Sequence, residues 1–260
     1  MNNSPVKIGN KQVGDGHPAY IIAEIGINHN GSLDIVRQLI DVAVDSGCNA
    51  VKLQKRTVDL VYTSEELARP RKNPFGATNG DLKRGLEFGL EEYTVIDGYC
   101  RERGIDWIAS CWDEASVDFI ERFNPPCYKI ASASLTDDDL LLHHRKYGRP
   151  IILSSGMSTM EEIEHAIEVL GEKDLILLHS TSTYPAKAEE LNLNMIQTFR
   201  AKYNFPIGYS GHEVGLSPTF AAVVIGANVI ERHFTLDRAM WGSDQAASLE
   251  PQGLHKLVDY

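Results

Sequence analysis

The sequence lacks a long apolar segment, and it carries no excess of positive charge. No apolar run approaches the roughly 20 residues that cross a membrane, and Met1-Asn2-Asn3-Ser4 does not begin a signal peptide. The formal net charge is −11, which argues against a surface that binds nucleic acid. We therefore expect neither a membrane nor a nucleic acid as a partner of this chain.

Cysteine is scarce, and nucleotide-binding glycine motifs are missing. Cys48, Cys100, Cys111 and Cys127 show neither close pairing nor the spacing of metal ligands. We expect free thiols, as is typical of a reducing compartment, and hence a cytoplasmic location. The sequence has neither a Walker-type loop nor a Rossmann glycine fingerprint, so it predicts no Gly-rich nucleotide site.

Eight short apolar runs rich in β-branched residues alternate with amphipathic stretches. The runs are Tyr20–Ala23, Ala50–Gln54, Trp107–Ala109, Tyr128–Ala131, Ile151–Leu153, Leu175–Leu178, Pro206–Tyr209 and Val229–Glu231. Continuous apolar runs suit strands that are buried on both faces of a parallel sheet. Eight βα units predict an α/β fold closed into a (β/α)₈ TIM barrel, with residues 1–260 as one domain. A doubly wound open sheet is the alternative, and polar residues at one end of the strands favour the barrel.

Three segments depart from this repeating pattern. Residues 1–16 contain a predicted β-hairpin that turns at Gly9-Asn10, and we expect it to cover the bottom of the barrel. Residues 55–93 form a long loop after the second strand, and loops of this length are usually functional or disordered. Its basic tip, Arg69-Pro70-Arg71-Lys72, is expected to be solvated. The eighth helix is expected to be truncated at 260.

Nearly every predicted strand ends in polar or ionisable side chains. In chain order these are Glu24, Asn28, His29, Lys52, Gln54, Ser110, Lys129, Ser132, Ser154, Ser155, His179, Thr181, Ser182, Ser210, His212, Glu231 and His233. The functional groups of a barrel collect where the strands run out into the following loops. A barrel with a purely structural role would not require these residues, so the pattern predicts an active site at this end.

Two lysines, Lys52 and Lys129, lie within strands that are otherwise apolar. A lysine inside a barrel is costly unless it meets an anion. Each could instead point outward or pair with a carboxylate such as Glu24. The presence of two lysines favours a site for a phosphate and a carboxylate, to which nearby hydroxyls would contribute. These hydroxyls belong to Ser110, Ser132, Ser154 and Ser210.

Two histidines stand at equivalent positions, since His212 follows the seventh predicted strand and His233 ends the eighth. A barrel places them on neighbouring strands, where they could hold a divalent ion with positions left for substrate and water. Either histidine could equally be a structural hydrogen-bonding residue, because the chain has nine. The matching positions, with Glu24 and Asp244 nearby, favour the metal site.

Short motifs follow one another from about Tyr20 to Leu249. They are Ala23–Gly31, Lys52–Gln54, Leu86–Gly89, Tyr128–Ser132, Leu153–Met157, Leu178–Pro185, Gly208–His212 and Glu231–Thr235. This ordered set closely resembles the N-acetylneuraminate (sialic acid) synthase family. The resemblance implies a TIM-barrel transferase that condenses phosphoenolpyruvate with an open-chain N-acylated amino sugar, such as N-acetylmannosamine, and releases phosphate. Precursors of legionaminic or pseudaminic acid are other possible sugars.

The resemblance also implies roles for individual residues. His212 and His233 would bind a divalent ion, Mn²⁺ with Mg²⁺ or Co²⁺ as alternatives, and would act in catalysis with Glu24 and Lys129. Phosphoenolpyruvate would be bound by Lys52, Ser110, Lys129, Ser132, Ser154 and Ser210. The sugar would be contacted by Glu24, Tyr184 and Asp244, and Gln54 and Ser182 complete the predicted substrate-binding set. A homo-oligomer, expected to be a dimer, is implied on family grounds.

The sequence departs from the family pattern in three ways that concern the sugar. Ser134 stands where sialic acid synthases commonly place an acidic residue, and Ser182 stands where some members have asparagine. The family usually continues into an antifreeze-like domain that supplies an arginine to a partner subunit, and we expect this chain to lack that domain. One alternative is a synthase for a phosphorylated sugar, which Arg69 or Arg71 at the pocket rim would favour. Another is a non-catalytic barrel that binds a metabolite.

Overall fold

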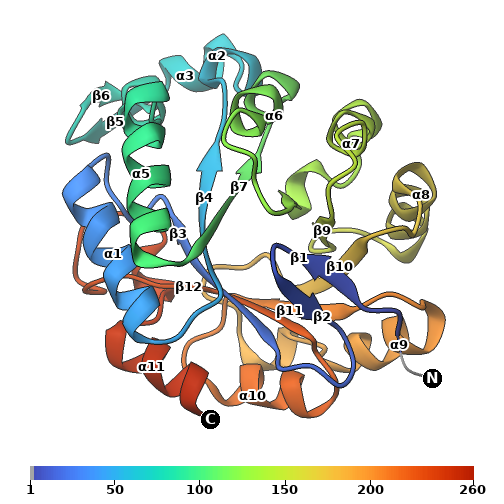
Figure 1. Ribbon diagram of the computed structural model, residues 1–260. Coiled ribbons are helices and arrows are strands. Elements are labelled where there is room, and N and C mark those ends of the chain that lie inside the picture. The colour runs from blue at the N-terminus through green and yellow to red at the C-terminus, as the bar shows by residue number, and fades with distance from the viewer. Residues whose placement is uncertain (1–2) are drawn as a thin grey trace.

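The computed structural model describes residues 3–260 and confirms the predicted (β/α)₈ barrel (Figure 1). Eight parallel strands pair in chain order, and β12 pairs with β3 to close the barrel, which excludes the open sheet. The strands are β3 (Tyr20–Gly26), β4 (Ala50–Lys55), β7 (Asp106–Cys111), β8 (Tyr128–Ile130), β9 (Ile151–Ser154), β10 (Leu175–Ser180), β11 (Ile207–Gly211) and β12 (Val229–His233).

Helices surround the barrel on its outside (Figure 1). Those that follow the strands are α1 (Leu33–Asp45), α5 (Leu90–Arg103), α6 (Glu114–Glu121), α7 (Asp138–Arg145), α8 (Met160–Leu170), α9 (Asn194–Lys202), α10 (Ser217–Val224) and α11 (Pro251–Asp259). In α1 the Ser32 side chain caps the first turn. The buried residues Val36, Leu39, Ile40 and Ala43 recur at helical spacing, so one face of the helix packs on the strands.

The predicted N-terminal hairpin consists of β1 (Val6–Ile8) and β2 (Lys11–Val13). Val6, Ile8 and Val13 are buried with the residues that face the barrel interior near its N-terminal end, among them Ile22 and Ile152. In Figure 1 the hairpin lies in front of β10 and β11. It therefore covers the bottom of the barrel, as expected from the sequence.

The segment 55–93, expected as a long loop, contains regular elements that the sequence prediction missed. They are α2 (Val58–Val61), α3 (Ser64–Ala68), β5 (Pro70–Asn73), β6 (Gly76–Thr78), α4 (Asn79–Gly85) and the first residues of α5. Capping boxes begin α3 and α4, at Thr63 and Thr78 respectively. Each element is too short to show a hydrophobic period, which explains the missed prediction. Arg71 and Lys72 are exposed, as expected.

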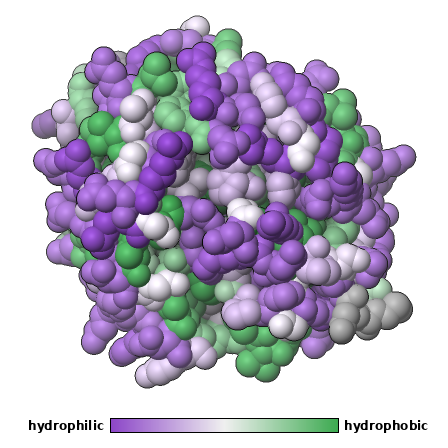
Figure 2. All heavy atoms as spheres, in the orientation of Figure 1, coloured by the Kyte–Doolittle hydropathy of each residue, from purple (hydrophilic) through white to green (hydrophobic). Residues whose placement is uncertain are grey.

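The surface is largely polar, and the four cysteines are unpaired as predicted. Figure 2 shows mostly hydrophilic side chains on the face seen in Figure 1, with small hydrophobic groups between them. Among residues 3–260, every helix is too short or too polar to cross a membrane. The four cysteines are buried and free.

Candidate active site

A cavity of about 220 Å³ opens where the eight barrel strands end. Every strand, or the loop that follows it, contributes to the lining. The lining includes Glu24, Lys52, Gln54, Ser110, Lys129, Ser132, Ser154, Ser182, Tyr184, Ser210, His212 and His233. The structure thus gathers every residue to which the sequence assigned a catalytic, substrate or metal role except Asp244, which lies just beyond the lining. The lining also leaves out five of the strand-end residues, namely Asn28, His29, Ser155, His179 and Thr181.

Strand alternation explains why these side chains point inward. Ile22, Ala50 and Val229 belong to the apolar cluster at the centre of the barrel. Side chains two positions apart on a strand share a face, so Glu24 and Lys52 face inward one layer closer to the mouth. The same relation holds for Ser110 after Ile108, Ser154 after Ile152, and Glu231 after Val229. The barrel core is therefore apolar toward the N-terminal ends of the strands and polar toward their C-terminal ends.

Lys52 lies at the centre of the polar layer. Its Nζ is 2.9 Å from Glu24 Oε2 and 3.7 Å from Glu231 Oε1. It also donates a hydrogen bond to Ser110 Oγ at 3.0 Å. The Lys52 side chain is 5% exposed, so the ammonium group depends on these partners in place of water.

Lys129 faces the same carboxylate from the other side. Its Nζ is 4.0 Å from Glu231 Oε1 and donates to Ser154 Oγ at 2.6 Å. Ser210 donates to the same Glu231 oxygen at 3.0 Å. Glu231 therefore links the two lysines. The sequence placed it among the strand-end polar residues but assigned it no role.

The charges of this cluster depend on burial and on each other. Burial raises the pKa of Glu24 to about 7, and Lys52 opposes the shift. Burial lowers the pKa of Lys129 to about 8. Burial also acts against ionisation of Glu231, but Lys129 and Lys52 outweigh it and lower the pKa to about 2. At neutral pH the layer thus holds two cations, one anion and a carboxyl able to exchange protons.

His212 and His233 meet at the rim, with ring centroids 5.5 Å apart. His212 Nδ1 lies 2.7 Å from the carbonyl oxygen of Thr181. Because a carbonyl only accepts, the proton is on Nδ1 and the lone pair is on Nε2, which is 2.8 Å from the Tyr184 hydroxyl. Burial lowers the pKa of His212 to about 4, so the ring is neutral.

This pair fits a divalent cation. A metal-bound histidine commonly donates its other ring N–H to a backbone carbonyl, as His212 does to Thr181. His233 Nδ1 is buried without a hydrogen-bond partner in the described part of the chain, and Asp244 Oδ2 is 3.9 Å away. Residues 3–260 form no group of three or more histidine, cysteine or acidic side chains suited to a metal. The protein would therefore supply two imidazoles, and substrate or water the remaining ligands.

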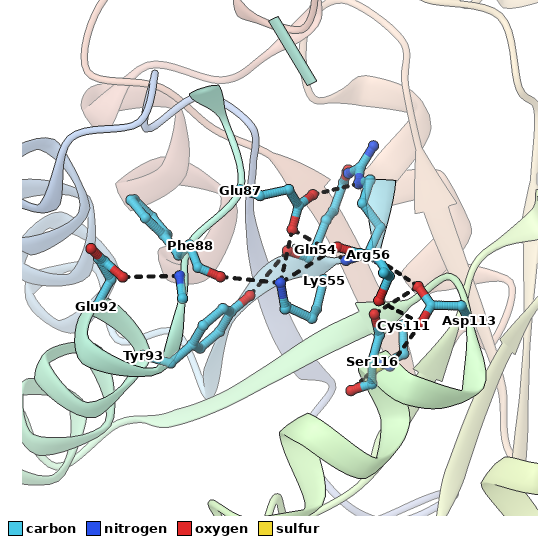
Figure 3. Close-up of polar contacts among 12 residues, drawn as sticks. Gln54, Lys55, Arg56, Glu87, Phe88, Glu92, Tyr93, Cys111, Asp113 and Ser116 are labelled. Atoms are coloured by element: carbon cyan, nitrogen blue, oxygen red, sulfur yellow. Dashed lines mark hydrogen bonds and ion pairs between the residues drawn. The ribbon is translucent and has the colours of Figure 1, made fainter. Parts of the chain in front are cut away.

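A second polar cluster, formed by Arg56 and Glu87, contacts the Gln54 side chain (Figure 3). Gln54 Nε2 donates to Glu24 Oε1 at 3.3 Å, and Gln54 Oε1 accepts from Arg56. Arg56 is buried, and its Nε lies 2.8 Å from Glu87 Oε1. The cluster fixes the Gln54 amide so that its N–H faces Glu24. Arg56 was not predicted, and Glu87 lies in the motif Leu86–Gly89.

Ser134 does not line the cavity. It is buried at the end of the 3₁₀ helix η1 (Ser132–Ser134), where its backbone N–H donates to Ala131 at 3.0 Å. Ser132, at the start of this helix, lines the cavity and accepts from the Gly156 N–H at 3.0 Å. A serine at position 134 thus leaves the polar layer of the cavity intact.

Known proteins resemble this chain over almost its whole length. The NeuB family profile matches residues 39–260. The chain is 39% identical over 251 residues to N-acetylneuraminate-9-phosphate synthase of Homo sapiens, a match that spans 95% of this chain and 70% of the human protein. It is 35% identical over 260 residues to N,N'-diacetyllegionaminic acid synthase of Legionella pneumophila, covering 96% and 73% of the two chains.

A solved structure agrees with these relatives. The N-acetylneuraminic acid synthetase of Leptospira borgpetersenii, crystallised with citrate, has a TM-score of 0.91 and 32% identity. The match covers 100% of this chain and 88% of that one. The chain belongs to the NeuB family and is an enzyme of the N-acetylneuraminate synthase type.

Proposed function

We propose that this enzyme condenses phosphoenolpyruvate with the aldehyde of an open-chain N-acylated amino sugar, giving a nonulosonic acid and phosphate. The observation that carries the proposal is the meeting of two buried lysines with two buried histidines in one cavity. Phosphoenolpyruvate brings a phosphate and a carboxylate, which suit ammonium groups and hydroxyls. Relatives named as synthases of N-acetylneuraminate-9-phosphate and diacetyllegionaminic acid support the same product class.

Lys52 and Lys129 would hold the anions of phosphoenolpyruvate. In the free enzyme, Glu24 and Glu231 keep Lys52 charged. Among residues 3–260, Lys129 has a single carboxylate partner, Glu231, at 4.0 Å. A bound phosphate would therefore meet an ammonium group that is short of negative partners. The Ser110 and Ser154 hydroxyls, already hydrogen-bonded to the two lysines, would add donors around it.

The sugar aldehyde would lie at the rim, beside His212 and His233. A divalent ion bound by these imidazoles, with Mn²⁺ proposed and Mg²⁺ or Co²⁺ as alternatives, would polarise the aldehyde as a Lewis acid. Carbon 3 of phosphoenolpyruvate then attacks the aldehyde carbon to form the new C–C bond. The aldehyde oxygen takes a proton from Glu24, whose raised pKa allows it to be protonated near neutrality.

Phosphate leaves in the second half of the reaction. The C–C bond formation leaves positive charge at carbon 2 of the former enol, and water adds there while Glu24 accepts its proton. The adduct then collapses. The bond from carbon 2 to the phosphate oxygen breaks, phosphate leaves with the electron pair and takes up the proton of the new hydroxyl group, and the oxygen from water becomes the carbonyl oxygen of the product. Lys52 and Lys129 balance the charge on the leaving phosphate.

The test is acceptor-dependent phosphate release. Phosphoenolpyruvate, Mn²⁺ and a panel of N-acylamino hexoses are incubated with the enzyme, and inorganic phosphate and the condensed acid are both quantified. We expect equal amounts of the two products. Lys129→Met should lose activity, whereas the exposed control Lys187→Met should keep wild-type activity. No release with any aldose, from a folded and metal-loaded sample, would favour the metabolite-binding barrel. The homodimer and the cytoplasmic location stay predictions.

A further inference from the structure

A second pocket, of about 290 Å³, lies beside the cavity at the mouth of the barrel. Asn30, Arg71, Lys72, Trp241 and Ser243 contribute to its lining. The two sites share a loop, since Ser243 lines the second pocket and the next residue, Asp244, reaches to 3.9 Å from His233. The Ser243 hydroxyl also donates to Asp244 Oδ1 at 2.7 Å. A ligand with two functional ends could therefore occupy both sites.

The hairpin of β5 and β6, which carries Arg71 and Lys72, is fixed at this mouth by Phe75. A side chain at Gly85 would overlap the Phe75 ring, and one at Gly31 would crowd it, so both glycines provide the space for this ring. Phe75 also meets Trp241 edge to face, with centroids 6.4 Å apart. These contacts seat the hairpin against the loop after β3 and the loop after β12.

The pocket carries two cations without anionic partners. Arg71 donates to the Asn79 amide oxygen at 3.3 Å, and neither Arg71 nor Lys72 has an ion pair within residues 3–260. Adjacent arginine and lysine side chains beside an aromatic wall suit a phosphate group on an organic ligand.

Asn30 provides a further polar contact. Its Nδ2 donates to the Trp241 carbonyl at 2.7 Å, which fixes the amide. Its Oδ1 is buried and has no hydrogen-bond partner in the described residues. A buried acceptor without a partner is costly, and a sugar hydroxyl would satisfy it. The pocket thus combines donors for an anion with an acceptor for a hydroxyl.

We propose that this second pocket binds the terminal phosphate monoester of a phosphorylated N-acylamino sugar, with Arg71 and Lys72 as its cations. The inference rests on the proposed function, because it places the aldehyde of the same sugar beside His212 and His233. An open-chain hexose carries its aldehyde and its 6-substituent at opposite ends, so one molecule would present one group to each site. The relative named N-acetylneuraminate-9-phosphate synthase makes a product with a phosphate, in line with such an acceptor.

The experiment compares a 6-phosphorylated N-acetylamino hexose with its unphosphorylated counterpart. We expect the wild type to prefer the phosphorylated acceptor. In the double variant Arg71→Ala/Lys72→Ala, the kcat/KM for the phosphorylated acceptor should fall by about 10- to 100-fold, mainly because KM rises. The KM for phosphoenolpyruvate and the kcat/KM for the unphosphorylated sugar should not change. Arg69→Ala is the matched control, because Arg69 is exposed beside the same hairpin but does not line the pocket.

Equal use of both sugars by the wild type, or an equal loss for both in the double variant, would overturn the inference. If neither sugar supports phosphate release, the proposed function fails. Calorimetry of the phosphorylated sugar then still tests whether the second pocket binds it. Weaker binding in the double variant but not in Arg69→Ala would support it. Inorganic phosphate that binds as tightly as the sugar phosphate would indicate a general anion site and overturn it.

Discussion

Lys52 Nζ and Glu24 Oε2 form an ion pair of 2.9 Å between neighbouring strands, with side chains only 5% and 1% exposed. The two residues are direct partners in the register of β3 and β4. Such a buried pair contributes little net stability, but breaking it leaves an uncompensated charge. In the proposed reaction the pair would keep Lys52 charged until the anionic substrate binds.

Replacing Lys52 should destabilise the enzyme in a way that depends on pH. Lys52→Met removes the partner that opposes the raised pKa of Glu24, so this carboxyl stays protonated to a higher pH in the folded state. A carboxyl whose folded pKa is raised costs stability as pH rises through that pKa. Urea unfolding should show a loss of about 3–5 kcal/mol at pH 8 and a smaller loss at pH 5.

Two comparisons make that result specific. Adding Glu24→Gln to Lys52→Met should recover part of the stability at pH 8, because the unpaired carboxylate is removed. Lys202→Met, which breaks an exposed pair with Glu164, should leave stability unchanged at both pH values. A loss in Lys52→Met that is identical at pH 5 and pH 8 would contradict the assignment.

Phosphoenolpyruvate affinity should fall above pH 8. Burial lowers the pKa of Lys129 to about 8, and only its ammonium form attracts phosphate. The binding contribution is complete below pH 8 and declines above it, approaching a tenfold loss of affinity per pH unit. The fluorescence of Trp112, which lines the cavity, provides the titration signal. Lys129→Met should bind weakly without this pH dependence, and constant wild-type affinity from pH 7 to 9.5 would refute the role.

Arg56 should act on catalysis through Gln54. Arg56→Lys loses the forked contacts to Gln54 and Glu87, which frees the Gln54 amide to turn away from Glu24. We expect kcat to fall about 10-fold or more, with little change in the KM for phosphoenolpyruvate. Arg122→Lys, at an exposed position, is the control and should leave kcat unchanged. Equal changes in kcat and KM in Arg56→Lys would indicate general damage to the site.

The two rim histidines should determine metal binding. His212→Ala and His233→Ala should each lose Mn²⁺ affinity by at least about 10-fold, measured by electron paramagnetic resonance of free Mn²⁺ and independently of activity. His165→Ala, at an exposed site on α8, should bind Mn²⁺ like the wild type. Normal Mn²⁺ binding and normal metal-dependent turnover in both rim variants would remove the metal assignment.

The sequence predicted the barrel because eight βα units repeat along the chain, and it predicted the polar end because nearly every strand ends in a polar side chain; both patterns are local. Glu231 belongs to the same strand-end pattern, but its role between two lysines depends on Lys52 and Lys129 from other strands, which the pattern alone does not show. Arg56 could not be found in this way, since its role depends on Glu87, 31 residues further along the chain. The second pocket depends on how Phe75 seats the hairpin against Gly31 and Gly85, which no periodicity records.

The fate of the bridging oxygen of phosphoenolpyruvate tests the proposed chemistry most directly. With ¹⁸O between carbon 2 and phosphorus, breakage of the carbon–oxygen bond should place the label in the released phosphate, as mass spectrometry would show. Label kept in the sugar acid would mean that the phosphorus–oxygen bond breaks instead. That outcome would contradict water addition at carbon 2 and the roles given to Glu24, Lys52 and Lys129.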